Sequence, residues 1–291
     1  MKAFAAQLAQ RAGGATVAVL FYGSNLRDAR LDGVLDFYIV LDRVGAWPGS
    51  RLAALANGVL PPNVGYREEE LDGKALRAKY ALISLSQFRR GVAHDALDTT
   101  LWARFSQPCC VAWVRSEVDL DAAVEVVSQA VTTAARWAAE LGPESGEVLA
   151  FWRELFARTY EAELRVERGG RGNDLVARDA ERYVRLLPAA WSAAGIGFTV
   201  GALATVAPGI SQSERKLARR QWALRRRLGK FLNFARLLKA AFTFDGAVDY
   251  VVWKVERHSG IRPEVTEWQR RHPVLAAPGL YWRLRRLGVL R

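Results

Sequence analysis

Four short apolar runs in the first part of the chain have the length and composition of buried strands. They are rich in Val, Ile, Leu, Tyr and Phe, which favour strands. The runs cover residues 16–22, 36–41, 76–85 and 111–115. Between the second and third runs, residues 51–60 carry a helical pattern that stops at Pro61-Pro62, because proline cannot continue a helix. This mixture predicts an α+β or α/β domain over residues 1–117, and we favour α+β.

The hydrophobic period becomes helical from Leu120 onward. Three segments separated by glycine-containing loops are expected as helices: 120–141, 147–167 and 174–187. We therefore expect two domains, with the strands in residues 1–117 and a mostly helical domain in residues 118–291.

Residues 186–213 contain no charged side chain and are long enough to cross a bilayer. They consist largely of Ala, Gly, Ser and Thr, so membrane insertion would be weakly driven. We expect a buried helix interrupted by glycines, and a shallow membrane-seated hairpin is the alternative.

Positive charge is concentrated in the last third of the chain. The net charge is +12, yet residues 215–239 hold ten Lys and Arg without an acid, and residues 268–291 hold six Arg without an acid. This concentration indicates a polyanionic partner: a membrane surface, a nucleic acid or a phosphorylated substrate.

Apolar residues recur within the basic segment at steps of three, four and seven, which places them on one side of a helix. They are Leu217, Leu224, Leu228, Phe231, Ala235 and Leu238. Two interpretations are open: a helix packed on its own domain, or a helix docked on anionic lipid with its cations at the headgroups. The aromatic and Arg-rich segment 281–287 suits a lipid surface as well. We expect an anionic membrane surface as a partner.

The cysteines and the first residues of the chain indicate in which cellular compartment the protein is expected. Cys109 and Cys110 are the two cysteines, and with three histidines they make no convincing zinc site or disulfide framework. The first residues lack the pattern of a signal or transit peptide. We expect a cytoplasmic protein, peripheral on the inner face of a bacterial cell membrane.

The candidate chemistry lies between the first two predicted strands. Tyr22-Gly23-Ser24 ends the first strand in a Gly-Ser turn, and Asp36 opens the second strand. A glycine lets backbone N–H groups approach phosphate, a serine hydroxyl donates to it, and an acid holds Mg²⁺ against it. This arrangement is typical of the nucleotidyltransferase (polymerase-β-like) fold.

One part of that pattern is missing. The fold usually supplies two acids two residues apart, because residues i and i+2 point to the same face of a strand. Here Val34 and Tyr38 flank Asp36 at those positions. Asp42 shares the face but lies about 20 Å along an extended strand, too far to share a metal ion. A second metal ligand must come from elsewhere.

Further motifs follow in order along the chain. They are Leu35-Asp36-Phe37, Val40-Leu41-Asp42, Ala46-Trp47, residues 79–84 (Lys-Tyr-Ala-Leu-Ile-Ser), Arg104 with Pro108, residues 160–165 (Tyr-Glu-Ala-Glu-Leu-Arg) and residues 241–246 (Ala-Phe-Thr-Phe-Asp-Gly). Together with the missing strand acid, they resemble the soluble, mitochondrial-type CDP-diacylglycerol synthases (phosphatidate cytidylyltransferases), over residues 16 to about 258. The chain departs from that family at Asn25, Pro48 and Gln107, where the family has glycine, histidine and often lysine.

The resemblance implies that CTP and phosphatidic acid react to CDP-diacylglycerol and diphosphate with Mg²⁺. Asp36 would bind the metal, and Glu163 or Asp32 would complete its shell. A plain strand-end acid that caps a turn is the alternative for Asp36. The attacking phosphate monoester is already an anion, so no general base is required, which fits the lack of an obvious catalytic histidine.

The remaining roles follow from the same resemblance. Gly23 and Ser24 would cradle the triphosphate, and Lys79 would contact it. Arg104 and Arg165 would face phosphate groups, with Arg165 nearer the lipid headgroup. A strand-edge lysine whose charged end reaches solvent is the alternative for Lys79, and a surface ion pair is the alternative for Arg104.

Three other functions would each explain part of the sequence. A nucleotidyltransferase acting on a cationic small alcohol would want an acidic acceptor pocket, whereas the second domain is basic. A nucleic-acid module would explain the charge but not the Gly-Ser turn with its acid, so no nucleic acid is expected as partner. A catalytically inactive protein that binds anionic lipid would explain the missing strand acid.

Overall fold

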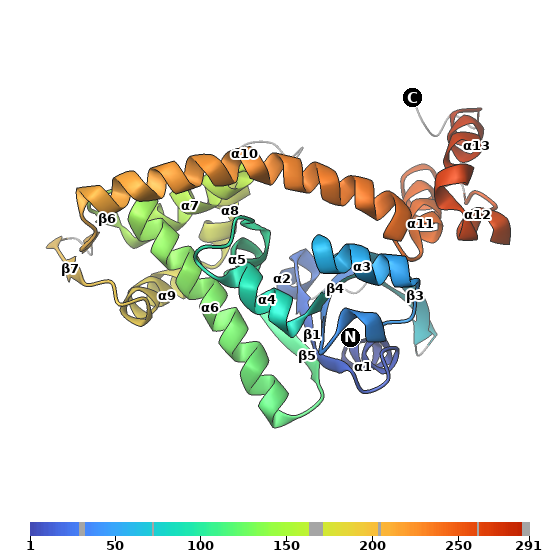
Figure 1. Ribbon diagram of the computed structural model, residues 1–291, viewed down its shortest axis with the longest axis horizontal. Coiled ribbons are helices and arrows are strands. Elements are labelled where there is room, and N and C mark those ends of the chain that lie inside the picture. Colours follow the sequence, from blue (N-terminus) through green and yellow to red (C-terminus); the bar gives the residue numbers. More distant parts are fainter. Residues whose placement is uncertain (29–32, 72, 163–170, 203–204, 261, 287–291) are drawn as a thin grey trace. The chain divides into compact units, whose positions relative to one another are not determined.

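A computed structural model describes residues 1–28, 33–71, 73–162, 171–202, 205–260 and 262–286, and it shows an α+β protein (Figure 1). The chain forms two compact units. Unit 1 comprises Met1–Leu85, Pro108–Leu120 and Arg236–Arg291, and unit 2 comprises Ser86–Gln107 and Asp121–Ala235. We expected one boundary after residue 117, whereas these units alternate along the chain.

Unit 1 is built on a mixed five-stranded sheet with the order β3-β4-β2-β1-β5. Its strands are β1 (Thr16–Tyr22), β2 (Val34–Leu41), β3 (Asn63–Leu71), β4 (Lys74–Ser84) and β5 (Cys109–Val114). β2 and β4 run parallel, and the other neighbours run antiparallel. The four apolar runs therefore predicted four strands, while β3 was not expected.

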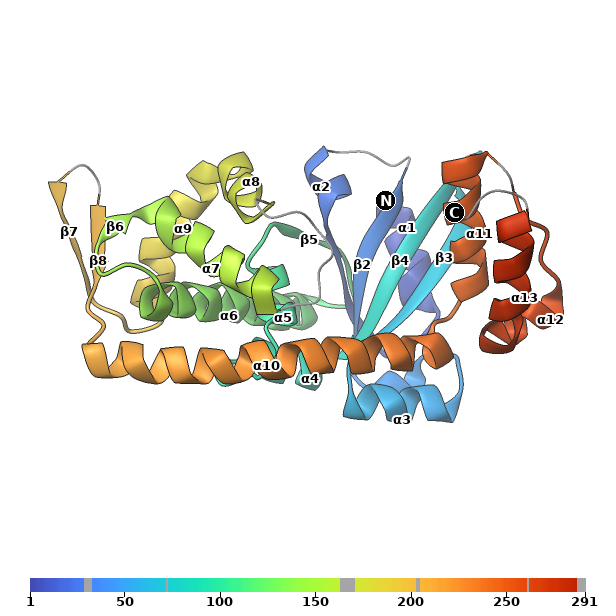
Figure 2. The ribbon, with the colours of Figure 1, turned by 90° about the horizontal axis from the view of Figure 1, so that it is seen from above.

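One face of this sheet carries the core of unit 1. Side chains alternate between the faces of a strand, so Phe21, Phe37 and Tyr80, which pair in register, point to the same side. There they pack with Phe4 and Leu8 of α1 (Lys2–Gln10), which lies against this face (Figure 2). Burying each such side chain stabilises the fold by about 1.5–3 kcal/mol. The alternate residues of β2 and β4 point to the opposite face.

Short helices complete unit 1. They are α2 (Ser24–Asp28), the 3₁₀ turn η1 (Val44–Ala46), α3 (Arg51–Val59), α11 (Ala247–Ser259), α12 (Glu267–Arg271) and α13 (Pro273–Arg286). α3 was expected, and the Ser50 hydroxyl caps it by accepting from Ala53 N at 3.0 Å. α11 lies beside β3, where the rings of Tyr66 and Tyr250 are 5.5 Å apart (Figure 2).

Unit 2 is mostly helical, as the period after Leu120 predicted. Its helices are α4 (Leu85–Val92), α5 (Thr100–Phe105), α6 (Glu117–Leu141), α7 (Val148–Ala162), α8 (Arg171–Arg178), α9 (Ala180–Ala193) and α10 (Gln212–Thr243), of which α4, α6 and α10 extend into unit 1. Buried tryptophans form much of its core, and the rings of Trp137 and Trp222 are 5.4 Å apart.

The uncharged segment 186–213 is not one interrupted helix, so that expectation was wrong. α9 ends at Ala193, and Gly195 adopts φ +70°, a conformation that ends helices and suits glycine. The chain then forms β7 (Phe198–Val200) and β8 (Thr205–Pro208), which make a small sheet with β6 (Gly146–Glu147). Among the described residues, no helix combines the length and apolar character needed to cross a membrane.

The basic helix α10 presents an unexpected face to unit 2. Its buried positions follow steps of three and four: Arg215, Ala218, Trp222, Arg225 and Gly229. The apolar stripe predicted for this helix lies largely in solvent, since Leu217, Leu224, Phe231 and Leu238 are exposed. The packed face thus includes two arginines, and much of the apolar stripe is left uncovered.

Candidate functional site

The sheet brings an acid and a lysine into one row on the face opposite α1. Tyr22 of β1 pairs with Asp36 of β2, and Asp36 pairs with Lys79 of β4. Paired residues of neighbouring strands share a face and lie side by side. Asp36 and Lys79, about forty residues apart in the chain, therefore project together from the centre of the sheet.

Gly23 lies directly against the carboxylate of Asp36. Its φ is +92°, in the region that favours glycine. A Cβ atom at this position would come within 2.9 Å of Asp36 Oδ2, closer than such contacts occur. Glycine is thus required here for its backbone conformation and for the close approach of the acid.

Ser24 begins α2, directly after this glycine, and is exposed. The next residue, Asn25, donates from Nδ2 to the carbonyl oxygen of Val34 at 2.7 Å. This bond ties the start of α2 to the start of β2, which fixes the Gly-Ser turn beside Asp36. Asn25 departs from the glycine of the resembled family, and its amide has this structural use.

A second cation follows on the same face. Arg77 stands two residues before Lys79 on β4 and therefore points to the same side. Its Nη2 lies 2.9 Å from Glu68 Oε1 of β3. We did not single out Arg77 from the sequence, although its spacing from Lys79 on a predicted strand was a usable signal.

Tyrosines flank the row on both sides. The rings of Tyr22 and Tyr38 are 5.5 Å apart. On β3, Tyr66 pairs with Lys79, is buried, and lies with its hydroxyl 3.3 Å from Glu68 Oε2. Burial, with the charge of Glu68, raises the pKa of Tyr66, so its hydroxyl stays protonated.

Three of the expected site residues, Asp32, Glu163 and Arg165, lie outside the described residues. Within the described part of the chain, no group of three His, Cys, Asp or Glu side chains gathers as a metal site. Asp36 alone nevertheless fits Mg²⁺, because this ion is commonly held by one or two carboxylates together with substrate phosphates.

Asp42 is occupied elsewhere, as its distance along β2 suggested. Arg115 donates to both of its oxygens, at 2.6 and 3.2 Å, and also to the carbonyl oxygen of Gly14 and to Asp119. This cluster stabilises the end of the sheet remote from Gly23.

Arg104 is a half-buried residue of α5 and belongs to unit 2. The Gly-Ser turn, Asp36 and Lys79 all belong to unit 1. The structure thus brings together four of the expected residues: Gly23, Ser24, Asp36 and Lys79.

Comparison with known proteins gives little further information. No family model matches the chain, and no curated protein matches it. A solved structure, that of a nucleotidyltransferase-like protein from Exiguobacterium sibiricum 255-15, aligns with 100% of this chain and 91% of its own length, at 11% identity and a TM-score of 0.28.

Proposed function

We propose that the chain is a Mg²⁺-dependent nucleotidyltransferase of the CDP-diacylglycerol synthase type. It would convert CTP and phosphatidic acid into CDP-diacylglycerol and diphosphate. The observation that carries this proposal is the contact of Gly23 with the Asp36 carboxylate, with Lys79 beside Asp36 in the same row. A glycine turn, an acid and a cation on one sheet face are the parts that a triphosphate with its metal ion needs.

Each residue has a definite part in this proposal. Gly23 and Ser24 cradle the triphosphate with backbone N–H groups and a hydroxyl. Lys79 offsets part of the phosphate charge. Asp36 holds Mg²⁺, which when bound neutralises charge on the phosphates.

Residues beyond this row complete the proposed site. Glu163 or Asp32 supplies the further metal ligand, while Arg104 and Arg165 face phosphate groups. These assignments rest on the family resemblance.

No side chain forms a covalent bond to a substrate in the proposed reaction. An oxygen of the phosphatidic acid monoester attacks the α-phosphorus of CTP, and a new P–O bond forms. The bond from the α-phosphorus to the bridging oxygen breaks, and diphosphate leaves with the electron pair. The nucleophile is already an anion, so positioning and charge neutralisation carry the rate enhancement.

The exposed stripe of α10 supports a lipid as acceptor. Leu217, Leu224, Phe231 and Leu238 lie in solvent, on a helix rich in Arg and Lys. Apolar residues between cations are typical of helices that lie in the interface of an anionic membrane. We therefore propose peripheral binding to an anionic membrane surface.

The decisive experiment incubates the full chain with CTP labelled at its α-phosphate, phosphatidic acid vesicles and Mg²⁺. We expect label in the lipid fraction, and we expect Asp36→Asn to abolish it. Asp42→Asn is the matched control, because it makes the same change on the same strand in the Arg115 cluster. Label transfer that survives in Asp36→Asn would contradict the proposed site.

A second candidate is a catalytically inactive protein that binds anionic lipid. The row contains one acid where the fold usually supplies two, which favours this alternative. It predicts vesicle binding with no labelled product under any substrate condition. Label transferred to an acceptor other than phosphatidic acid would instead indicate a different nucleotidyltransferase.

A further inference from the structure

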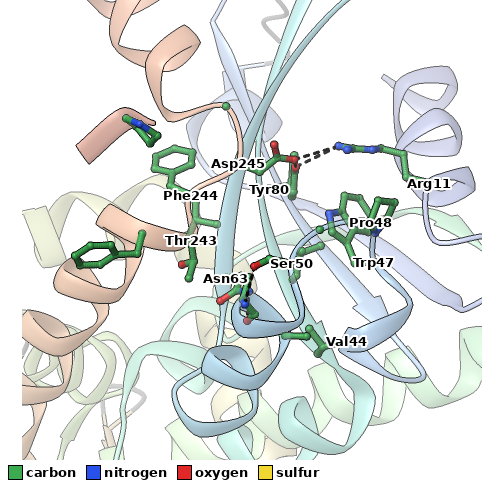
Figure 3. Close-up of a pocket in the computed structure, with 18 of the residues that line it drawn as sticks. Arg11, Val44, Trp47, Pro48, Ser50, Asn63, Tyr80, Thr243, Phe244 and Asp245 are labelled. Atoms are coloured by element: carbon green, nitrogen blue, oxygen red, sulfur yellow. Dashed lines mark hydrogen bonds and ion pairs between the residues drawn. The ribbon is translucent and has the colours of Figure 1, made fainter. Parts of the chain in front are cut away.

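Unit 1 contains a pocket of about 520 Å³ on the other side of its sheet. Tyr80 and Leu82 of β4 line it, and both point to the face of α1, away from Asp36 and Lys79. Its other walls come from α3, from the start of β3 and from the segment that follows α10 (Figure 3). This volume is in the range of small-molecule sites.

An internal ion pair lies in the wall of the pocket. Tyr80 donates to Asp245 Oδ2 at 2.6 Å, and Arg11 donates to the Tyr80 hydroxyl at 3.2 Å while lying 3.6 Å from the same carboxylate (Figure 3). The Arg11 guanidinium also stacks over Trp47 at 4.8 Å. The charges of Arg11 and Asp245 therefore largely cancel.

One cation at the pocket is left for a ligand. Arg270 is committed to Asp249 at 2.9 Å and Glu267 at 3.0 Å. Its neighbour Arg271 also lines the pocket, is exposed, and forms no ion pair with any described acid. The pocket thus offers one positive charge, that of Arg271, without an ion-pair partner among the described acids.

The mouth of the pocket is apolar and uncovered. Phe242, which lines it, is 69% exposed. Leu238, one turn before Phe242 on α10, is exposed as well. Hydrogen bonds hold the end of α10 to the segment that follows α3, since Lys239 donates to the carbonyl oxygens of Leu60 and Pro62. Exposed apolar side chains at the rim of a pocket suit a ligand that carries apolar chains.

We propose that this pocket binds one membrane phospholipid with a singly charged phosphodiester head. Arg271 pairs with the head, and the aromatic walls of Trp47, Phe242 and Phe244 receive the glycerol and upper acyl region. The exposed side chains of Phe242 and Leu238 rest in the bilayer interface. A triphosphate does not suit the pocket, because one unpaired cation would meet three or more negative charges. The site lies on the face opposite Asp36 and does not depend on transfer chemistry.

The test uses a soluble probe, dihexanoylphosphatidylglycerol below its critical micelle concentration, titrated calorimetrically into the full chain. We expect one lipid per chain. Ala54→Phe, which fills the pocket, and Arg271→Glu, which reverses the charge, should each weaken binding by at least about tenfold.

Two matched variants should bind like the unchanged chain. Val118→Glu places the same kind of charge on another exposed apolar site of unit 1, and Asp36→Asn removes the proposed transfer activity without touching this pocket. Loss of labelled product with intact lipid binding in Asp36→Asn therefore separates the two proposals.

Three outcomes would overturn the lipid site. One is unchanged binding in folded Ala54→Phe, or, if that variant fails to fold, in Arg271→Glu. Another is equal affinity for the zwitterionic dihexanoylphosphatidylcholine. The third is displacement by inorganic phosphate at the same concentration as the lipid, which would reduce the site to a phosphate contact.

Discussion

Two features of the structure require glycine at position 23. Its φ is positive, and Asp36 Oδ2 lies close to the position that a Cβ atom would occupy. In Gly23→Ala, the new methyl group must push the Asp36 carboxylate away. A displacement of about 1 Å in a positioned group costs on the order of 10²-fold in rate. We expect this loss in transfer of label from CTP, measured at saturating lipid.

Gly13→Ala is the control for Gly23→Ala. Gly13 has φ +57°, but nothing lies within 4 Å of its Cβ position. Both variants should lose stability through backbone strain, on the order of 1 kcal/mol, and only Gly23→Ala should lose transfer. Equal activity in the two would mean that the contact with Asp36 has no part in the reaction.

Lys239 makes the stability of the fold depend on pH. Its ammonium donates to three oxygens near the end of α3, and burial, with the charge of Arg236, lowers its pKa from 10.5 to about 8. Between about pH 8 and 10.5 the unfolded chain holds this proton more often than the folded chain. Stability contributed by this group therefore rises with pH across that window.

The measurement compares the free energy of unfolding of the unchanged chain with that of Lys239→Met from pH 7 to 10. The difference in favour of lysine should grow as pH passes 8. Lys216→Met, at an exposed position of α10, should show no such growth. A difference that stays flat or shrinks would contradict the lowered pKa.

At the scale of single elements, α10 packs with its arginines inward. Arg225 donates to the carbonyl oxygens of Ala96 and His94, at 2.9 and 3.0 Å, and stacks over Trp137 at 4.5 Å. Gly229 allows close packing on α7, since a Cβ there would meet the carbonyl oxygen of Ala162 at 2.7 Å. The buried side of this helix thus combines arginine hydrogen bonds to carbonyl oxygens with the apolar contacts of Trp222.

Arg225→Ala should therefore destabilise the protein by about 2–3 kcal/mol, because it removes charged hydrogen bonds and leaves partly buried carbonyls without this donor. Arg226→Ala, one position further on the same helix and exposed, should change stability by less than about 0.5 kcal/mol. Urea unfolding curves of the two variants give the comparison. Similar losses in both would indicate that helix propensity, not the buried contacts, controls stability here.

The elements that the sequence predicted are those with a strong apolar pattern. β1 and β2 are buried along most of their length and appear as apolar runs. β3 was missed because its outer half contains Glu68, Glu69 and Glu70, which are tolerated at the edge of a sheet. The sequence also did not predict which face of α10 is buried. Periodicity identifies an apolar stripe on a helix but not the face that packs against the rest of the protein.

The candidate site was predictable in its local part only. Residues 22–24 and Asp36 stand close together in the chain, and the turn between them follows from glycine and strand chemistry. The pairing of Asp36 with Lys79 depends on the parallel register of β2 and β4, and such a register is set by the whole sheet. The resemblance, not the pattern, directed attention to Lys79.

At the scale of the whole molecule, the proposed binding to an anionic membrane would draw on a net charge of +12 and on the exposed stripe of α10. We expect the chain to float with vesicles that contain phosphatidylglycerol. The bound fraction should fall as the salt concentration rises from about 50 to 500 mM, because at the higher concentration charges are screened within a few ångströms. Vesicles of phosphatidylcholine alone should bind weakly.

Phe231→Glu should reduce flotation, whereas Val124→Glu, at an exposed position of α6, should not. Binding that ignores both salt and lipid charge would contradict electrostatic docking.

The alternation of the two units along the chain has a consequence for synthesis on the ribosome. The outer edge of β3 bonds to Asp245, through Tyr66 N to the Asp245 carbonyl oxygen at 2.8 Å, and this partner is made some 180 residues after β3. A nascent sheet therefore exposes an open edge while unit 2 is translated. The negative charges at 68–70 oppose pairing of that edge with other chains until residue 245 emerges.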